Sequence, residues 1–309
     1  MKNRAVQWLA IAVTTLGLTA CESVSNTPDP LAGSVIDEAN LNELMLTAGD
    51  PEDAAEYFQQ SLAREPDRAD FRRGLAVSLA RAKRYNEAAR VFQELITLNQ
   101  DKPIDRLEYS FVAMRLDRWD DVKTLSQSFP DGLQTSRRYV IDAMVADQAN
   151  DWAAADAAYA RAEKLSSRPA AVLNNWGVSQ MSRGDLTAAT AIFTRAVSFD
   201  SRLFNAKNNL AIVRGLQRQY NLPLVPLSDE ERAVLLNNLG IIAMRQGDER
   251  IARGLFAAAV DAHPQHYASA ADKLAALEAI GQNLRHDGNS SVDRGHGRDG
   301  DPHGSGGLV

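Results

Sequence analysis

The feature of this sequence that most constrains its fold is a stretch that occurs twice. Residues 173–201 read LNNWGVSQMSRGDLTAATAIFTRAVSFDS, residues 236–264 read LNNLGIIAMRQGDERIARGLFAAAVDAHP, and the two align without a gap. In both copies a Leu/Trp-Gly pair is followed by a Gly-Asp turn, an alanine, an aromatic residue and a second alanine. Self-similarity at a fixed period indicates an array of small units rather than one globular core.

Alanine and aromatic residues keep their places in earlier copies of this 34-residue frame. In the copy at 136–169, Ala155, Tyr159 and Ala162 occupy the alanine, aromatic and alanine positions. The copy at 103–135 is one residue short, and the degenerate copy at 204–232 keeps only a first helix before the loop NLPLVPLSDEE. We therefore expect a solenoid over 35–281, with units at 35–68, 69–102, 103–135, 136–169, 170–203, 204–232 and 233–266 and a closing helix at 267–280.

This pattern resembles the tetratricopeptide repeat, a pair of antiparallel helices. Gly177 lies where the first helix meets the second, so a side chain larger than alanine is expected to hold them apart. Ala189 permits the reciprocal approach, and Phe193 fills the gap to the next unit. The second copy has Gly240, Ala252 and Phe256 at these places. One helix pair cannot bury both of its faces, so stacking supplies the core. The predicted fold class is all-α: a tetratricopeptide-repeat solenoid, a right-handed superhelix of helix pairs.

A second informative segment surrounds the chain's one cysteine, Cys21. Lys2 and Arg4 precede an apolar run, AVQWLAIAVTTLGL, which is shorter than the ~20 residues a spanning helix needs. The run leads into LTAC, which resembles the bacterial lipobox. The resemblance implies a lipoprotein signal peptide at 1–20, cleavage after Ala20 and covalent lipid, such as palmitate, on Cys21. An ordinary secretory signal and an uncleaved anchor are the alternatives.

Lipidation would fix the mature chain to a membrane, because each buried methylene contributes about 0.8 kcal/mol. Glu22 stands where an aspartate favours inner-membrane retention in enteric-type sorting, so we expect the periplasmic face of the outer membrane. Residues 21–34 are rich in Pro, Ser and Gly and suit a flexible tether. Removal of residues 1–20 leaves a net charge of about −8, from 32 basic and 40 acidic residues, which argues against a nucleic-acid partner.

Paired asparagines mark the expected concave wall. They precede the Leu/Trp position in three consecutive units, as Asn174 and Asn175, Asn208 and Asn209, and Asn237 and Asn238. An amide can pair with both C=O and N–H of an extended peptide. The row resembles the asparagine ladder of the O-GlcNAc transferase repeats, which implies a partner-binding groove. The alternative is that these residues serve solubility or bond helix to helix.

Motifs for other kinds of binding or catalytic site are incomplete or do not occur in the sequence. A carboxylate clamp would need lysine or arginine beside asparagine, and Arg72, Arg73 and Arg106 do not complete such a set. Phosphate-loop, G-x-S-x-G and HExxH motifs do not occur, and the carboxylates are expected on exposed helix faces. We predict no enzyme activity, metal, cofactor other than the lipid, or small-molecule substrate. Residues 282–309 form a Gly/Asp/His-rich stretch with almost no apolar content and are predicted to be a disordered tail.

The region from 172 to 277 narrows the choice of family. The segments NNWGVSQMSRGDLTAA, AKNNLAIVRGLQRQYNLPLVPLSDEERAVLLNNLGIIAMRQGD and AVDAHPQHYASAADKLAAL resemble TadD, the lipoprotein family of tight-adherence (Flp) pilus assembly. The truncated unit RQYNLPLVPLSDEERA is the most distinctive element. The resemblance implies a non-enzymatic assembly factor acting on the secretin or on other machinery components, and no particular contact residue. The alternative is a general envelope adaptor, in outer-membrane β-barrel assembly or regulation of a cell-wall enzyme.

Overall fold

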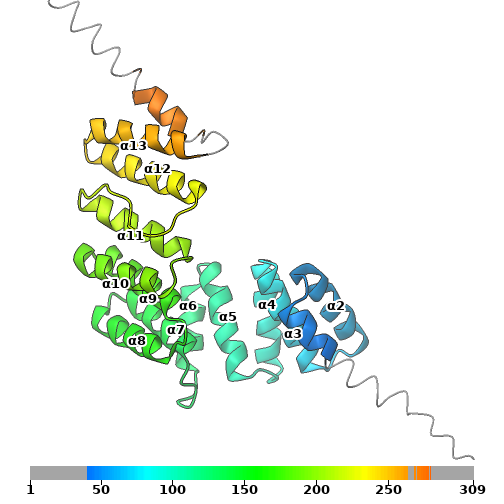
Figure 1. Cartoon of the computed structure of the whole chain (residues 1–309). Helices are drawn as coiled ribbons and strands as arrows, with labels where there is room; N and C mark the ends of the chain where they lie inside the picture. Colours follow the sequence, from blue (N-terminus) through cyan, green and yellow to red (C-terminus); the bar gives the residue numbers. More distant parts are fainter. Residues whose placement is uncertain (1–39, 264–267, 269, 278, 280–309) are drawn as a thin grey trace, which may run out of the picture.

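A computed structural model describes residues 40–263, 268, 270–277 and 279, and these residues form helices and connecting turns without a strand (Figure 1). The expected signal peptide at 1–20, the lipid site at Cys21, the tether at 21–34 and the tail at 282–309 lie outside the described residues. Within the described part of the chain, no helix combines the length and the apolar character needed to cross a membrane.

Twelve helices have both ends described, and residues 40–47, 268, 270–277 and 279 are also helical. The twelve are α2 (Pro51–Arg64), α3 (Ala69–Arg81), α4 (Tyr85–Thr97), α5 (Pro103–Arg115), α6 (Trp119–Gln127), α7 (Ser136–Gln148), α8 (Trp152–Leu165), α9 (Ala170–Ser182), α10 (Leu186–Phe199), α11 (Phe204–Leu216), α12 (Asp229–Arg245) and α13 (Glu249–Ala262). The predicted all-α solenoid is confirmed.

The helices pack as consecutive pairs along one curved path (Figure 1). The first helices of the pairs are α3, α5, α7, α9, α11 and α12, and the second helices are α2, α4, α6, α8, α10 and α13. Successive first helices touch directly, as α3 with α5, α5 with α7 and α9 with α11. No two successive second helices in the described chain pack comparably. Closer spacing of the first helices places them on the inner side of the curve.

From α3 onward, each unit turns after its first helix at a residue in the left-handed region of backbone space. Gly184 and Gly247 have φ of +86° and +80° there, which glycine adopts without steric cost. Lys83, Asp117, Asn150 and Arg218 hold the same place in the other units with φ between +56° and +62°. At the first Gly-Asp turn the aspartate caps the second helix, since Asp185 accepts a 2.9 Å hydrogen bond from the Ala188 amide.

The aromatic positions of the repeat lie in the core. The largest fully buried side chains include Phe58, Phe92, Tyr159, Phe193 and Phe256. The helix pairs approach more closely than the sequence pattern predicts. A Cβ placed on Gly177 would lie 2.5 Å from the Phe193 ring, so alanine itself is too large unless that ring moves.

A strap, residues 217–228, replaces the second helix after α11. Arg218 begins it with the same turn that starts a second helix in other units. Pro223 and Pro226 then prevent a helix because proline lacks the amide donor and clashes with the preceding turn. Val225 packs against the buried cluster that contains Phe193, and Leu222 packs against the cluster that contains Phe256. The strap thus joins the cores on either side of the missing helix.

A buried charge fixes the far end of the strap. Lys207 on α11 is 3% exposed, and its Nζ donates to the Pro226 carbonyl at 3.1 Å and to Glu231 Oε2 at 2.6 Å. Ser228 and Glu231 form a capping box at the start of α12. Burial works to raise the pKa of Glu231, but the Lys207 hydrogen bond, the Ser228 amide and the Lys207 charge together lower it.

Candidate protein-interaction groove

One apolar stripe follows the inner side of the solenoid. We define the inner stripe as the residue directly after the small residue of each first helix: Val77, Phe111, Met144, Val178, Ile212 and Ile241. All six side chains are partly exposed, and Val178 is 40% exposed. Two pockets at equivalent places lie along this stripe.

The first groove pocket lies between α3 and α5 and has a volume of about 240 Å³. Val77 and Phe111 of the inner stripe line it, with Tyr85 and Phe92 from α4. Arg81, Glu108 and Arg115 are its charged residues. This combination gives an apolar floor with a charged rim, as is typical of sites for side chains of a partner.

Two of the three charged side chains of the first groove pocket already form hydrogen bonds within the described part of the chain, and the third does not. Arg81 donates three hydrogen bonds of 2.9–3.0 Å to the carbonyls of Met45, Leu46 and Gly49. These bonds hold the end of the helix at 40–47 in place. Glu108 accepts a bidentate pair of hydrogen bonds from Arg137. Among the described residues, the exposed guanidinium of Arg115 has no such partner.

The second groove pocket lies between α7 and α9 and has a volume of about 280 Å³. Its apolar lining comes from Met144 and Val178 of the inner stripe and from the rings of Trp119 and Tyr159. Its polar lining consists of Asp147, Gln148, Asn175, Ser179 and Ser182. The pocket therefore repeats the apolar floor of the first but contains no cation.

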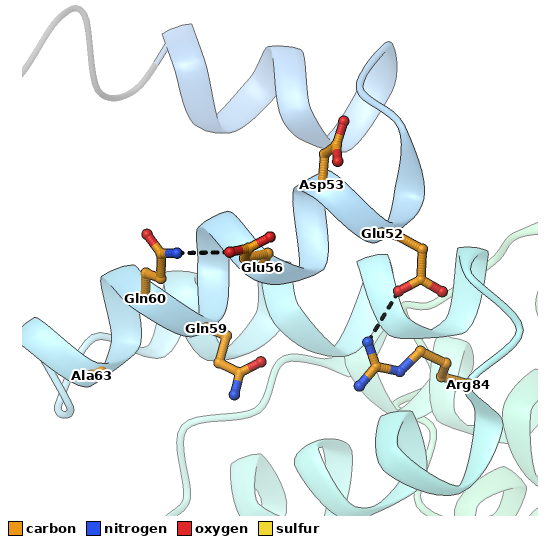
Figure 2. A pocket seen from close by; sticks show the side chains of 7 residues that line it. All are labelled: Glu52, Asp53, Glu56, Gln59, Gln60, Ala63 and Arg84. Carbon is orange, nitrogen blue, oxygen red and sulfur yellow. Dashed lines mark hydrogen bonds and ion pairs between the residues drawn. The ribbon is translucent and has the colours of Figure 1, made fainter.

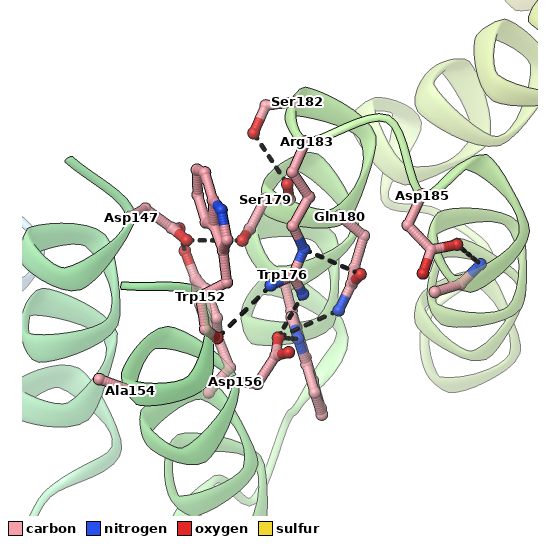
Figure 3. Close-up of polar contacts among 12 residues, drawn as sticks. Asp147, Trp152, Ala154, Asp156, Trp176, Ser179, Gln180, Ser182, Arg183 and Asp185 are labelled. Atoms are coloured by element: carbon pink, nitrogen blue, oxygen red, sulfur yellow. Dashed lines mark hydrogen bonds and ion pairs between the residues drawn. The ribbon is translucent and has the colours of Figure 1, made fainter. Parts of the chain in front are cut away.

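Hydrogen bonds to Asp147 hold the second groove pocket in shape. Asp147 on α7 accepts from the Ser179 hydroxyl of α9 at 2.6 Å and from the Tyr159 hydroxyl of α8 at 3.0 Å (Figure 3). Burial raises the pKa of Tyr159, and the Asp147 charge raises it further. Tyr159 therefore stays a neutral donor.

A second carboxylate joins α8 to α9, two of the helices that line this pocket. Figure 3 shows Asp156 of α8 facing two donors of α9 and one from Arg183, the residue directly after α9. Its Oδ1 accepts from Trp176 Nε1 at 2.7 Å, Gln180 Nε2 at 3.0 Å and Arg183 Nη2 at 2.6 Å. The Trp176 ring also stacks on Tyr159, with centroids 6.1 Å apart. The helices that form this pocket are thus rigidly positioned.

The predicted asparagines form hydrogen bonds between first helices. Asn209 Nδ2 donates to Asn174 Oδ1 at 3.0 Å, and Asn238 Nδ2 donates to Asn208 Oδ1 at 2.8 Å. The first pair thus crosses from α9 to α11, and the second crosses from α11 to α12, where the second helix is missing. All four side chains remain half-buried rather than fully covered.

The other two asparagines have separate surroundings. Asn175 does not share in the amide pairs and instead lines the second groove pocket. Asn237 is 4% exposed, and its Oδ1 has no hydrogen-bond partner among the described residues. Its Nδ2 lies 3.5 Å from Asn238 Oδ1. Of the six predicted positions, Asn237 is therefore the least accessible to a partner.

The clamp arginines bind within the chain, and one carboxylate corrects an expectation. Arg73 Nε donates to Asp105 Oδ1 at 2.6 Å, and Arg106 Nε donates to Asp101 Oδ2 at 2.5 Å. Arg72 is 8% exposed and donates to the Pro66 carbonyl at 2.6 Å. Asp105 is only 2% exposed, so the expectation that carboxylates occupy exposed faces is wrong there, because Arg73 compensates its charge.

A further pocket, of about 560 Å³, lies on α2 rather than in the groove. Figure 2 shows its lining of Glu52, Asp53, Glu56, Gln59, Gln60, Ala63 and Arg84. Glu52 pairs with Arg84 at 3.0 Å, and Glu56 accepts from Gln60 at 3.0 Å. Ala63 is its one apolar lining residue, so this hollow lacks the apolar floor of the groove pockets.

Sequence reasoning identified the core positions but missed the inner stripe. The signal was present, because an apolar residue follows Ala76, Ser110, Ala143, Gly177, Ala211 and Gly240 in every unit from 69 onward. In a single helix such a residue is indistinguishable from a core position. Only the packing of successive first helices leaves these side chains partly exposed.

Comparison with known proteins agrees with this architecture. A family model for the tetratricopeptide repeat matches residues 45–103 and 143–203. No curated protein matches. A chain in the crystal structure of the APC/C hetero-tetramer Cut9–Hcn1 is 14% identical, with a TM-score of 0.53. The likeness covers 76% of this chain and 48% of that one, so the chain spans about half of its length.

A second solved structure, a tetratricopeptide repeat protein from Parabacteroides merdae, is 12% identical, with a TM-score of 0.52. The likeness covers 80% of this chain and 99% of that chain. At such identities the likenesses speak for the fold alone. Together with the repeats, they show the fold of a tetratricopeptide-repeat solenoid, and the two matched stretches carry a repeat that generally serves in binding other proteins.

Proposed function

We propose that this chain is a non-enzymatic lipoprotein scaffold for assembly of the tight-adherence (Flp) pilus. Lipid on Cys21 anchors it to the periplasmic face of the outer membrane, and its inner face binds the secretin or another component of the pilus machinery. The observation that carries the binding role is the pair of equivalent groove pockets on the inner stripe.

The anchoring and pilus roles are supported by the sequence. The basic start, apolar run and LTAC segment occur in the order of a lipoprotein signal, and the truncated unit resembles the TadD family. The strap gives that truncated unit a physical role, since its apolar side chains join the cores on either side.

Asparagines contribute to the groove in two ways under this proposal. The amide pairs between Asn174 and Asn209 and between Asn208 and Asn238 set the spacing of the first helices. Each of these amides retains bonding capacity beyond the asparagines it already contacts, and offers it to backbone groups of the bound segment. Asn175 offers its whole amide from within the second groove pocket.

The test compares secretin abundance, secretin multimers and surface pili in four strains. These carry a deletion of the gene, Cys21→Ala, Val178→Asp or Leu165→Asp. Leu165 is a matched control, because it is 49% exposed at the end of a second helix, whereas Val178 is 40% exposed on the inner stripe. We expect multimers and pili to fail in the first three strains and to persist in the fourth.

Each failure of that pattern has a definite meaning. Normal secretin and pili in the deletion strain would refute the pilus role and favour a general envelope adaptor, acting in β-barrel assembly or on a cell-wall enzyme. Normal pili with Cys21→Ala at normal abundance would refute lipid anchoring as a requirement. Equal effects of Val178→Asp and Leu165→Asp would refute use of the inner face.

A further inference from the structure

We infer that the groove binds an extended partner segment that inserts two apolar side chains six residues apart, with an acidic side chain next to the first. This inference rests on the proposed role of the inner face and specifies the chemistry of its partner. The first apolar side chain occupies the pocket between α3 and α5, and the second occupies the pocket between α7 and α9.

The two pockets are equivalent because their linings are in register. Val77 and Phe111, 34 residues apart, lie on either side of the first groove pocket. Met144 and Val178, also 34 residues apart, lie on either side of the second. Equivalent positions of a solenoid face the same way, so one segment following the inner stripe reaches both pockets.

The spacing of the partner side chains follows from helix packing. The first helices α3, α5, α7 and α9 succeed one another along the inner side, and packed helices are roughly 8–10 Å apart. The midpoint between α3 and α5 is therefore about 16–20 Å from the midpoint between α7 and α9. An extended chain rises about 3.3 Å per residue, and its side chains alternate between two faces, so about six residues span that distance with both side chains on the same face.

Charge distinguishes the two ends of the segment. Arg81 and Arg115 line the first groove pocket, where Arg137 offsets the charge of Glu108. The second groove pocket has Asp147 and no cation among its lining residues. The N-terminal end of the groove is therefore positive although the chain as a whole carries −6. Arg115 is the cation with bonding capacity to spare, so the partner places a carboxylate there.

Side chains of both pockets favour apolar groups of varied shape. Phe111 and Tyr85 supply flat surfaces in the first, and Met144 supplies a flexible thioether in the second. Volumes of about 240 and 280 Å³ accommodate one large side chain each rather than a whole small-molecule ligand. The groove thus recognises a spacing of apolar residues more than one strict sequence.

The test is selection of random 12-residue peptides displayed as internal inserts, so that neither end is free, on the purified full-length lipoprotein in detergent. We expect enriched peptides to carry two apolar residues six apart and an acidic residue beside one of them. No enrichment, or enrichment without that spacing, would overturn the inference. So would enrichment found only when the same library is displayed with free C-termini, because the carboxylate would then be terminal.

Variants then assign the pockets, with a synthetic copy of the most enriched peptide as the probe in fluorescence polarisation. Val178→Asp should weaken its binding at least about tenfold, as loss of one buried aliphatic group implies. Leu165→Asp should leave it unchanged. Val178→Ser, expected to weaken it severalfold, replaces Val178→Asp if circular dichroism shows the latter to be misfolded. Equal binding to wild type and both Val178 variants would contradict the assignment.

Arg115→Glu tests the charge. It should weaken binding of the acidic peptide about two- to fivefold and reverse the selected preference from acidic to basic residues. An unchanged preference would refute the role of Arg115.

The outcome for the pilus role is separate from the outcome for this inference. If the selected peptides share the expected spacing but pili are normal in the deletion strain, the pilus role is refuted and this inference stands. Conversely, loss of pili with Val178→Asp together with no consensus among the selected peptides would overturn this inference and leave the pilus role standing.

Discussion

Replacing Gly177 with alanine is expected to destabilise the protein, although alanine is the better helix former. Gly177 lies on α9, where a Cβ would approach the Phe193 ring to 2.5 Å at Cε1, 2.6 Å at Cδ1 and 2.8 Å at Cζ. Phe193 is fully buried on α10, so its ring has little room to move. Contacts below 3.0 Å force either the ring or the helix to shift.

Two opposing effects set the change in the free energy of unfolding for Gly177→Ala. Overpacking of a filled core costs about 1–3 kcal/mol. Alanine in place of glycine within a helix returns roughly 0.5–1 kcal/mol. Ala76 and Ala143 stand at the equivalent place in other units, so a helix pair built around a methyl group is tolerated. We therefore expect a net loss of about 1 kcal/mol, near the lower end of the overpacking range.

Gly254→Ala is the matched control. Gly254 lies within α13, and a Cβ built there meets no atom within 4 Å. The same substitution should therefore stabilise the protein by about 0.5–1 kcal/mol. The assay is urea unfolding followed by circular dichroism at 222 nm. If Gly177→Ala is as stable as wild type while Gly254→Ala gains stability as expected, the close packing of Phe193 does not control this helix pair.

Three further predictions concern the strap, the amide pairs and the tail. Lys207→Met should cost about 2–3 kcal/mol in urea unfolding by removing charge-assisted bonds to Pro226 and Glu231, and an unchanged midpoint would refute this role of Lys207. The Glu231 pKa is lowered in the folded state, so its contribution is complete above about pH 5. It is lost as the pH falls through the lowered pKa, and the effect of Lys207→Met should shrink there. Asn238→Ala should cost about 1 kcal/mol by unpairing Asn208, whereas equal stability would make that pair dispensable. Deleting residues 282–309 should leave the circular dichroism signal per molecule unchanged, and a loss of helical signal would contradict a disordered tail.

Much of the architecture was predictable because it depends on local chemistry repeated along the chain. The Gly-Asp dipeptides at 184–185 and 247–248 both fix a left-handed turn using only neighbouring residues, and at 184–185 the aspartate also caps the next helix. Pro223 and Pro226 exclude a second helix after α11 regardless of what packs nearby. The alanine and aromatic positions indicate a core because their period matches that of the stacked units.

Other features were decided by the tertiary structure. Asp147 and Asp156 appear in the sequence as two ordinary acidic residues, and only the approach of α9 supplies Ser179, Trp176, Gln180 and Arg183 as donors. The amide pairs likewise join residues about one unit apart, so no local pattern distinguishes them from amides directed at a partner. These amides bond to one another across helices because of the spacing of α9, α11 and α12.

By itself, the sequence determined that the chain forms stacked helix pairs, where each pair turns and where one second helix is missing. It could do so because these properties depend on residues within one unit. The tertiary structure decided which apolar residues lie along the inner stripe and which carboxylates are held within the fold. Those outcomes depend on how far successive first helices stand apart, a distance that packing across units sets and that no single unit encodes.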